Sequence, residues 1–123
     1  MIHLDTNFLI QALLAGSPAE AKLQAWLTAG ENLGISTIAW SEFLCGPLTP
    51  QDEALAQLLL AAPEPFLAVD ARGAATLFNA TGRRSRTLAD CQIAAIALRS
   101  GARVATGNVP DFTPFQNHGL LLA

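Results

Sequence analysis

Apolar and polar positions along this chain predict short strands separated by amphipathic helices. Segments that are apolar on both faces are typical of buried strands, and longer segments with apolar residues at i, i+3, i+4 and i+7 are typical of helices. We expect strands at 1–5, 33–37, 65–70 and 102–106, with a weaker one at 119–123. We expect helices at about 7–15, 17–29, 38–44, 49–62, 70–82 and 87–100.

Start and stop signals support several of these helices. Ser17 followed by Pro18 and Glu20 is a strong helix start, because serine caps the free N–H groups and proline suits the first turn. Glycines at 16, 30 and 101 end predicted helices, and Asp70 is expected to cap the helix that follows it.

Strands and helices that alternate in this order indicate a parallel sheet covered on both sides. We therefore predict a three-layer α/β/α sandwich with a mostly parallel central sheet. A length of 123 residues is enough for one domain, spanning 1–123. In such folds ligands bind at the carboxyl ends of the strands, so the residues just after each strand carry the functional information.

The amino-acid composition predicts a protein partner and a cytoplasmic location. The chain is 51% hydrophobic and only 14% charged, against a usual charged share of about 25%. This is more apolar surface than one small core hides, so we expect a protein partner. No apolar run spans a membrane, the start lacks a signal peptide, and Cys45 and Cys91 form no disulfide or zinc pattern. We expect a cytoplasmic protein with free thiols.

Four acidic residues fall where the predicted sheet would gather functional groups: Asp5, Glu42, Asp90 and Asp111. Each has a local alternative, since Asp5 or Asp90 could serve a helix start, Glu42 could face solvent and Asp111 could be a loop acid. Several carboxylates brought together repel each other unless a cation holds them, and such oxygen ligands suit Mg²⁺ or Mn²⁺. The net charge of −3 excludes broad electrostatic binding to nucleic acid but not an acidic, metal-neutralised nuclease site.

Four motifs in this order resemble a PIN-domain ribonuclease of the VapC type, the toxin of a toxin–antitoxin pair. They are "LDTN" at 4–7, "SEF" at 41–43, "ADCQIAAIA" at 89–97 and "ATGNVPDF" at 105–112, and they span nearly the whole chain. The chain departs from the family pattern at Asn108, where an acid is common. Either Asn108 supplies an amide oxygen or hydrogen bond there, or Asp111 supplies the carboxylate.

The resemblance implies a PIN-like fold and a metal-dependent endoribonuclease that hydrolyses RNA with a metal-activated water. Its catalytic and metal-binding residues would be Asp5, Glu42, Asp90 and Asp111, with Asn108 as a further metal ligand. Thr6, Asn7 and Thr106 would hold these groups by hydrogen bonds, although capping and turn formation also explain them. The resemblance further implies a homodimer, inhibited by a cognate VapB-like antitoxin.

A basic cluster, "GRRSR" at 82–86, precedes Asp90 and holds three of the seven Lys and Arg residues. Arg83, Arg84 and Arg86 either contact RNA phosphates or form a solvated loop. Three other functions stay open on sequence alone. A metal-free ribonuclease could use His3 and His118, a phosphotransferase could use an aspartyl nucleophile, and an inactive PIN-like domain could serve as a binding module.

Overall fold

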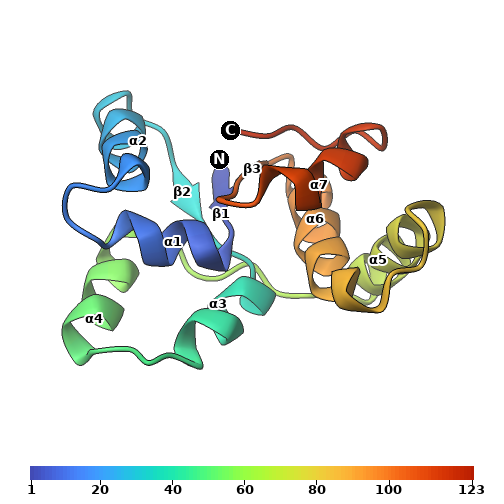
Figure 1. Cartoon of the computed structure of the whole chain (residues 1–123), viewed down its shortest axis with the longest axis horizontal. Helices are drawn as coiled ribbons and strands as arrows, with labels where there is room; N and C mark the ends of the chain where they lie inside the picture. Colours follow the sequence, from blue (N-terminus) through green and yellow to red (C-terminus); the bar gives the residue numbers. More distant parts are fainter.

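The computed structural model describes all residues, 1–123, and has a small parallel sheet at its centre (Figure 1). Its strands are β1 (Ile2–Leu4), β2 (Leu33–Gly34) and β3 (Arg103–Ala105), in the order β2-β1-β3. Ile2 pairs with Leu33 on one side and with Arg103 on the other. All three strands are parallel, so their carboxyl ends lie at one edge of the sheet.

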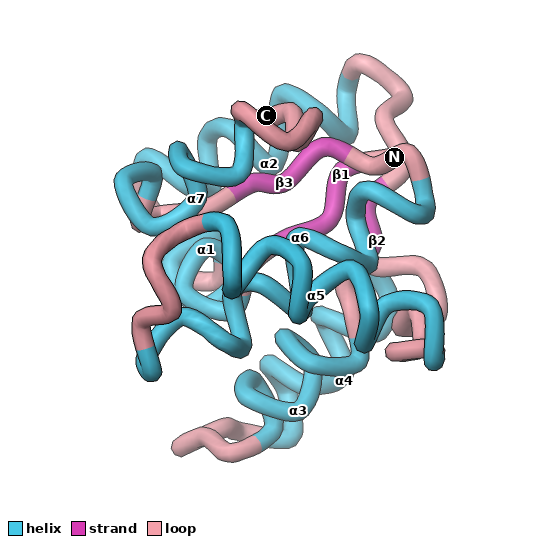
Figure 2. Tube along the Cα trace, turned by 90° about the vertical axis from the view of Figure 1, so that its right-hand side faces the viewer, coloured by secondary structure: helices cyan, strands magenta, loops and turns pink.

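Helices cover the sheet from both sides (Figures 1 and 2). In Figure 1, α1 and α2 lie to the left of the sheet and α5, α6 and α7 lie to the right, with α3 and α4 below. Their bounds are α1 Thr6–Ala12, α2 Pro18–Thr28, α3 Thr37–Leu44, α4 Pro50–Leu59, α5 Ala68–Ala80, α6 Leu88–Ser100 and α7 Val109–Gln116, with a 3₁₀ turn η1 at Ser85–Thr87. The predicted α/β/α sandwich with a parallel sheet is confirmed. No helix is long and apolar enough to cross a membrane.

Capping side chains account for where most helices begin. Ser17 accepts a hydrogen bond from the Glu20 N–H at 3.0 Å, and Thr49 accepts one from the Asp52 N–H at 3.1 Å. Pro18 and Pro50 occupy the first turns of these two helices, where no N–H is needed. These are local interactions, which is why the sequence predicted both starts correctly.

The core is one continuous apolar cluster around β1 and α6. Ile2, Leu4 and Val104 contribute from the sheet, and Ile93 and Ile96 of α6 are fully enclosed. The face of α6 that begins at Asp90 is therefore the helix face turned toward the core.

The predicted strand at 65–70 is wrong. Residues 65–67 are extended but pair with no strand, apart from a single bridge between Ser36 and Glu64, and α5 already begins at Ala68. Asp70 therefore lies in the first turn of α5 rather than before it, where its Oδ2 accepts a hydrogen bond from the Leu67 N–H at 2.9 Å. The segment before α5 is held by backbone hydrogen bonds of Glu64 with Ile35 and Thr37, and by the contacts of Arg99 with Glu64 and Asp70.

Three other boundaries differ from the sequence prediction. The predicted fifth strand at 119–123 is reduced to one bridge between Leu122 and Val104. The helix expected at 7–15 is shorter, since α1 spans Thr6–Ala12 and its last turn is replaced by the turn that leads to α2. The first strand, predicted at 1–5, spans only Ile2–Leu4 and is paired on both sides.

Helix α7 lies in a region where the sequence analysis predicted no helix, and a loop position was one alternative for Asp111. Pro110 lies in the first turn of α7, as Pro18 does in α2 and Pro50 does in α4. Phe112 and Phe115 are buried on the inner face of α7. The i, i+3 spacing of these two phenylalanines was the available signal. Pro114 inside the helix, a residue that normally interrupts helices, obscured it.

Candidate active site

The site lies in the crevice between the ends of β1 and β3. The chain places β2 on one side of β1 and then β3 on the other, so the strand order reverses at this point. Asp5 follows β1 and Thr106 follows β3, and the Thr106 hydroxyl donates a hydrogen bond to Asp5 Oδ2 at 3.0 Å. The Asp5 N–H donates to the Ala105 carbonyl at 2.8 Å, so backbone pairing holds the two strand ends together. This is the position at which parallel α/β sheets bind ligands.

Asp5 serves two roles at once. It is the N-cap of α1, and its Oδ1 accepts a hydrogen bond from the Thr6 N–H at 2.8 Å, while its side chain faces the crevice. Asp5 is only 6% exposed. Burial and the charge of Asp111 raise its pKa, whereas the hydrogen bonds from Thr106 and Thr6 partly oppose that rise. The structure thus confirms Asp5 as the cap of α1 and leaves its other carboxylate oxygen bound to the Thr106 hydroxyl.

Thr6 links Asp5 to α3. Its hydroxyl lies 3.1 Å from the Ala39 carbonyl and 3.4 Å from Glu42 Oε1, and the shorter contact is the stronger one. Glu42 is exposed on α3, but partial desolvation and the charge of Asp5 raise its pKa. The Glu42 carboxylate of α3 therefore lies near the Asp5 carboxylate that follows β1.

Asp90 lies in the first turn of α6 and is half-buried. Burial, together with the charges of Asp5, Asp111 and Glu42, raises the pKa of Asp90 to about 7. Thr87 precedes this helix but does not cap it, because its hydroxyl donates to the Arg84 carbonyl at 2.8 Å instead. The carboxylate at the head of the apolar α6 stripe is thus surrounded by other carboxylates.

Asp111 and Asn108 lie in the outer part of the site. Asp111 is exposed in the first turn of α7, and its charge acts on both Asp5 and Asp90. Asn108 is held by its backbone, since its N–H donates to the Thr106 hydroxyl at 3.0 Å. Asn7 is exposed and its side chain makes no hydrogen bond, so the structure does not connect it to the acids. Asp111, rather than Asn108, brings a charge to this cluster.

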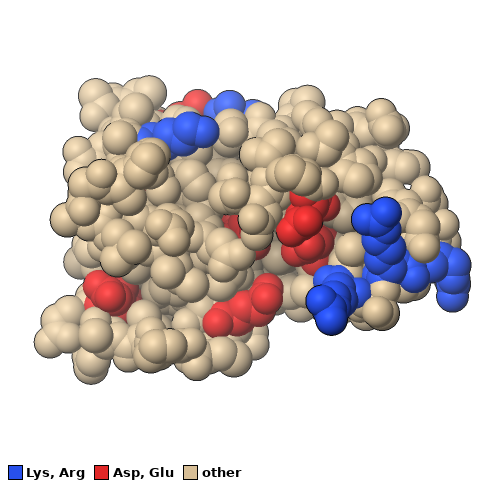
Figure 3. All heavy atoms as spheres, viewed as in Figure 1, with Lys and Arg blue, Asp and Glu red and all other residues tan.

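The four carboxylates have no basic partner. The three ion pairs of the protein join Arg99 to Glu64 and Asp70, and Arg103 to Glu31, all outside the site. Figure 3 shows the acidic side chains gathered near the middle of one face. Carboxylates that raise each other's pKa values and lack a cation fit a divalent ion chemically.

The site is open, and the side chains alone do not enclose a metal ion. No three His, Cys, Asp or Glu side chains converge closely enough to surround an ion by themselves. Mg²⁺ commonly keeps several waters and uses only one or two carboxylates, so the more distant groups would act through water. Asp5 is held in place by two hydrogen bonds and is the best-oriented oxygen donor for such an ion.

Basic side chains border the acidic group on the side of α6. Arg84 lines a small cavity of about 60 Å³ together with Thr87 and Asp111, which places it at the rim of the site. Arg83 has a left-handed backbone (φ 55°), donates to Asn79 and lies over the Phe78 ring, so it is turned toward α5. Arg86 is exposed and forms no ion pair. The structure therefore brings Arg84 to the acids and directs Arg83 away from them.

The two histidines do not form a catalytic pair. His3 is only 3% exposed in β1, and its Nδ1 has no hydrogen-bond partner. Burial lowers the pKa of His3, so it is a neutral core residue near neutral pH. His118 is exposed in the turn after α7. The structure gives no support to a metal-free histidine mechanism.

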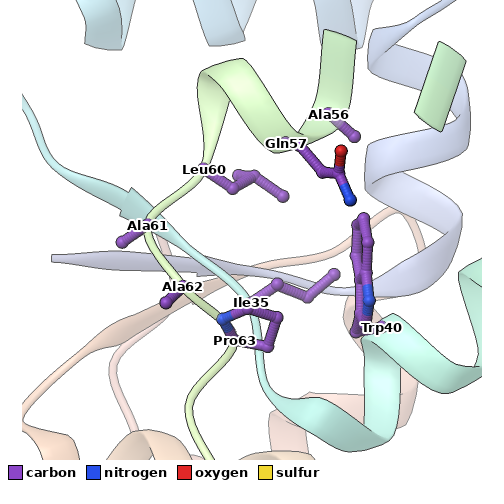
Figure 4. Close-up of a pocket in the computed structure, with 8 residues that line it drawn as sticks. All are labelled: Ile35, Trp40, Ala56, Gln57, Leu60, Ala61, Ala62 and Pro63. Carbon is purple, nitrogen blue, oxygen red and sulfur yellow. The ribbon is translucent and has the colours of Figure 1, made fainter. Parts of the chain in front are cut away.

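Two further cavities lie beneath α4 and beside the end of β3. The one beneath α4 measures about 170 Å³ and is lined mainly by apolar side chains, with Gln57 and Trp40 pointing toward one another (Figure 4). It contains no acid or base. The other lies between α1, α2 and the end of β3 and includes Lys22. The sequence analysis did not single out Lys22, although it is the only Lys or Arg before residue 72.

Comparison with known proteins identifies the family. The model of the PIN domain family matches residues 2–109. This chain belongs to the PIN-domain family. PIN domains are generally nucleases that use divalent metal ions. Among curated proteins, none matches the chain.

Solved structures of similar fold agree with this assignment to the PIN domains. FitAcB from Neisseria gonorrhoeae has a TM-score of 0.75 and 26% identity, over 99% of this chain and 96% of that one. A toxin–antitoxin complex from Klebsiella pneumoniae has a TM-score of 0.70 and 26% identity, over 91% and 90%. VapBC2 from Rickettsia felis, bound to a DNA fragment from its promoter, has a TM-score of 0.75 but 20% identity, over 100% and 98%, which shows the fold alone.

Proposed function

We propose that this PIN domain is a Mg²⁺- or Mn²⁺-dependent endoribonuclease that acts as the toxin of a toxin–antitoxin pair. The observation that carries this proposal is the group of four carboxylates at the β1/β3 crevice, which has no Lys or Arg partner. A site that only bound a protein would gain nothing from unpaired, mutually repelling acids. The same acids serve hydrolysis of a phosphodiester when a divalent cation neutralises them.

The position of each site residue suggests its role. Asp5 and Asp90 are the main ligands for the cation, because Asp5 is fixed by Thr106 and Thr6 and Asp90 lies on the rigid first turn of α6. Glu42 and Asp111, both exposed, face the outer side, where they hold water or accept its proton. Asn108 orients Asp5 indirectly through the Thr106 hydroxyl.

A divalent cation bound there would neutralise the scissile phosphate and lower the pKa of a water molecule. Glu42 has a raised pKa, so it accepts a proton more readily than an ordinary glutamate does. Arg84 at the rim would contact an RNA phosphate next to the site, with Arg86 farther along the loop. Such contacts position the RNA without selecting its sequence.

An antitoxin and a second copy of the chain are the proposed protein partners. The 26% identity to a toxin–antitoxin complex from Klebsiella pneumoniae, over 91% of this chain, supports an antitoxin partner. Large apolar side chains such as Leu58, which is 84% exposed, and Leu121, which is 64% exposed, support further protein contacts.

The first experiment is cleavage of purified total RNA in Mg²⁺ or Mn²⁺ and in excess chelator. Glu42→Gln removes one site carboxylate, and Glu53→Gln makes the same chemical change in α4, where the carboxylate makes no hydrogen bond or ion pair. We expect discrete cleavage that requires the metal and falls at least 100-fold in Glu42→Gln, as for loss of a general base or ligand. Glu53→Gln should cleave like the unaltered protein.

Three other results would contradict the proposal. Equal cleavage in chelator would exclude metal-dependent chemistry. Equal cleavage by Glu42→Gln and Glu53→Gln would remove Glu42 from the mechanism. Metal binding without cleavage of any RNA would favour an inactive PIN-like binding module.

A further inference from the structure

A second pocket adjoins the acidic site through Thr106. Its volume is about 260 Å³, and it is lined by Phe8, Gln11, Pro18, Lys22, Thr106 and Gly107, among others; we call it the Lys22 pocket. The hydroxyl of Thr106 also donates to Asp5, so the pocket and the acidic site share a wall. The volume is just below the range of about 300–1,000 Å³ typical of small-ligand pockets, which suits one nucleotide.

The charge of this pocket is opposite to that of the site. No acidic side chain lines it, whereas Lys22 brings an exposed ammonium group that takes part in no ion pair. Figure 3 shows basic side chains at the upper left and at the right of the acidic group. Lys22 lines this pocket, and Arg84 lines the small cavity that contains Asp111. A phosphate that would be repelled by the four acids is therefore accepted on each side of them.

The walls of the pocket suit a nucleobase. Phe8 is held against Trp26, with ring centroids 5.4 Å apart, and gives an apolar surface beside Pro18. Gln11 is exposed at the pocket and offers both a hydrogen-bond donor and an acceptor, as base edges require. Single-stranded RNA presents unstacked bases to this combination of apolar wall and amide.

Gly107 keeps the pocket open. A Cβ added at this position would meet no atom within 4 Å, and its backbone does not require glycine. The missing side chain is therefore not explained by packing, but it leaves room beside Thr106 for a ligand.

From these observations we propose that the Lys22 pocket binds the nucleotide next to the scissile phosphate of a single-stranded RNA. Lys22 contacts the phosphate, and Gln11 contacts the base. The proposal rests on the proposed nuclease function. It adds that the RNA extends from the acids into the Lys22 pocket, on the side opposite Arg84. Lys22 and Gln11 are positioning residues, since neither reaches the acids.

The test measures binding of a short fluorescent single-stranded RNA in Mg²⁺, in an Asp90→Asn background that prevents cleavage. Lys22→Gln should weaken binding about tenfold, the size of one hydrogen bond to a charged group. It should also reduce the slope of log affinity against log salt by about 0.7, the value for one phosphate of a single strand. Gly107→Leu should weaken binding by filling the pocket while leaving that slope unchanged.

Arg72→Gln is the matched control. It removes one positive charge from the exposed face of α5, outside both pockets that border the acids, and should bind RNA like the background protein. Thermal unfolding midpoints of the three variants should agree, which excludes misfolding as a cause of weaker binding.

The outcomes separate this inference from the nuclease function. If the unaltered protein cleaves RNA while Lys22→Gln and Gly107→Leu bind like Arg72→Gln, the nuclease stands and the nucleotide pocket is wrong. If the protein neither cleaves nor binds RNA, both are wrong. If the two variants lose affinity for the antitoxin but not for RNA, the pocket is a protein contact and the inference is overturned.

Discussion

Single residues of this protein carry structural and chemical roles together. Asp5 caps α1 with Oδ1 and accepts the Thr106 hydroxyl with Oδ2, so the group that starts a helix also forms the crevice. The cost of such a site is visible in Asp90, whose pKa is raised to about 7 by burial and by neighbouring acids. A carboxylate that is harder to ionise in the folded state destabilises the fold whenever it is ionised.

The first prediction concerns Asp90→Asn in the presence of chelator. The folded state holds the Asp90 proton up to about pH 7, whereas the unfolded chain releases it near pH 4. The charge at Asp90 therefore costs most above pH 7, and its cost disappears as the pH falls toward 4. We expect Asp90→Asn to stabilise the protein by roughly 1 to 2 kcal/mol at pH 8, after discounting for solvent around this half-exposed group.

Chemical denaturation at pH 8 and at pH 4.5 measures this difference. The gain should be much smaller at the lower pH. An Asp90→Asn variant that is equally or less stable at pH 8 would show that Asp90 does not repel its neighbours.

At the scale of elements, α6 connects the site to the rest of the fold. Its first turn holds Asp90, and Arg99 in its last turn donates to Asp70 Oδ1 and Glu64 Oε1, each at 2.8 Å, and to the Pro65 carbonyl at 3.0 Å. These contacts bind α5 and the segment before it to α6. They add to the backbone hydrogen bonds that join Glu64 to Ile35 and Thr37.

The second prediction is that Asp70→Asn loosens this connection. Burial alone would raise the pKa of Asp70, but hydrogen bonds from Arg99 and from the Leu67 N–H outweigh it, and the pKa is lowered. Folded Asp70 thus binds fewer protons than unfolded Asp70, so its stabilisation is present above about pH 4 and is lost as the pH falls below that. We expect Asp70→Asn to lower the unfolding midpoint at pH 7 by roughly 5 to 10 °C.

Glu31→Gln is the comparison for Asp70→Asn. It breaks the ion pair with Arg103, whose side chains are 35% and 38% exposed, and should change the midpoint by less than about 3 °C. Calorimetry of both variants at pH 7 decides between them. Equal losses would mean that the burial of Asp70 adds nothing to its ion pair.

At the scale of the whole molecule, the fold concentrates negative charge at one crevice of a chain with a net charge of only −3. Strand ends, α3, α6 and α7 each bring one carboxylate to it from distant parts of the sequence. Of the remaining acids, Glu31, Glu64 and Asp70 are paired with arginine, and the others are partly exposed without an ion pair. We therefore expect the stability of the molecule to depend on a divalent cation.

The third prediction is that Mg²⁺ or Mn²⁺ stabilises the folded protein. A ligand at 100 times its Kd adds about 2.7 kcal/mol when it binds only the folded state. We expect a corresponding rise in the unfolding midpoint at pH 8 and a smaller rise at pH 6, because protons then compete for Asp90. Differential scanning fluorimetry with increasing metal measures both.

Asp90→Asn should lose most of the metal-dependent rise, and Glu53→Gln should retain it. A rise of the same size in Asp90→Asn would show that the cation binds elsewhere. No rise in the unaltered protein would argue against a metal site in the crevice.

Local features of the sequence by themselves determined several helix boundaries and the parallel strands of this protein. The serine and proline at 17–18 start α2, the glycine at 101 ends α6 in the left-handed conformation that favours it, and continuous apolar segments predict parallel strands. These features depend on residues within a few positions of one another, which is why they were predictable. The choice of Asp5, Glu42, Asp90 and Asp111 came from their places after strands and from the family motifs, since spacing alone says nothing of proximity.

Only the tertiary structure decided the rest, because it depends on contacts between distant residues. Residues 65–67 have the composition of a strand, but pairing stops at the Ser36–Glu64 bridge and α5 begins at Ala68, next to the contacts of Arg99 with Glu64 and Asp70. Helix α7 forms despite Pro114 because Phe112 and Phe115 are buried against the core. The place of Arg84 beside Asp111 and the Lys22 pocket beside Thr106 likewise depend on residues far apart in the sequence. The direction of Arg83 does not, because its contacts with Asn79 and Phe78 are local.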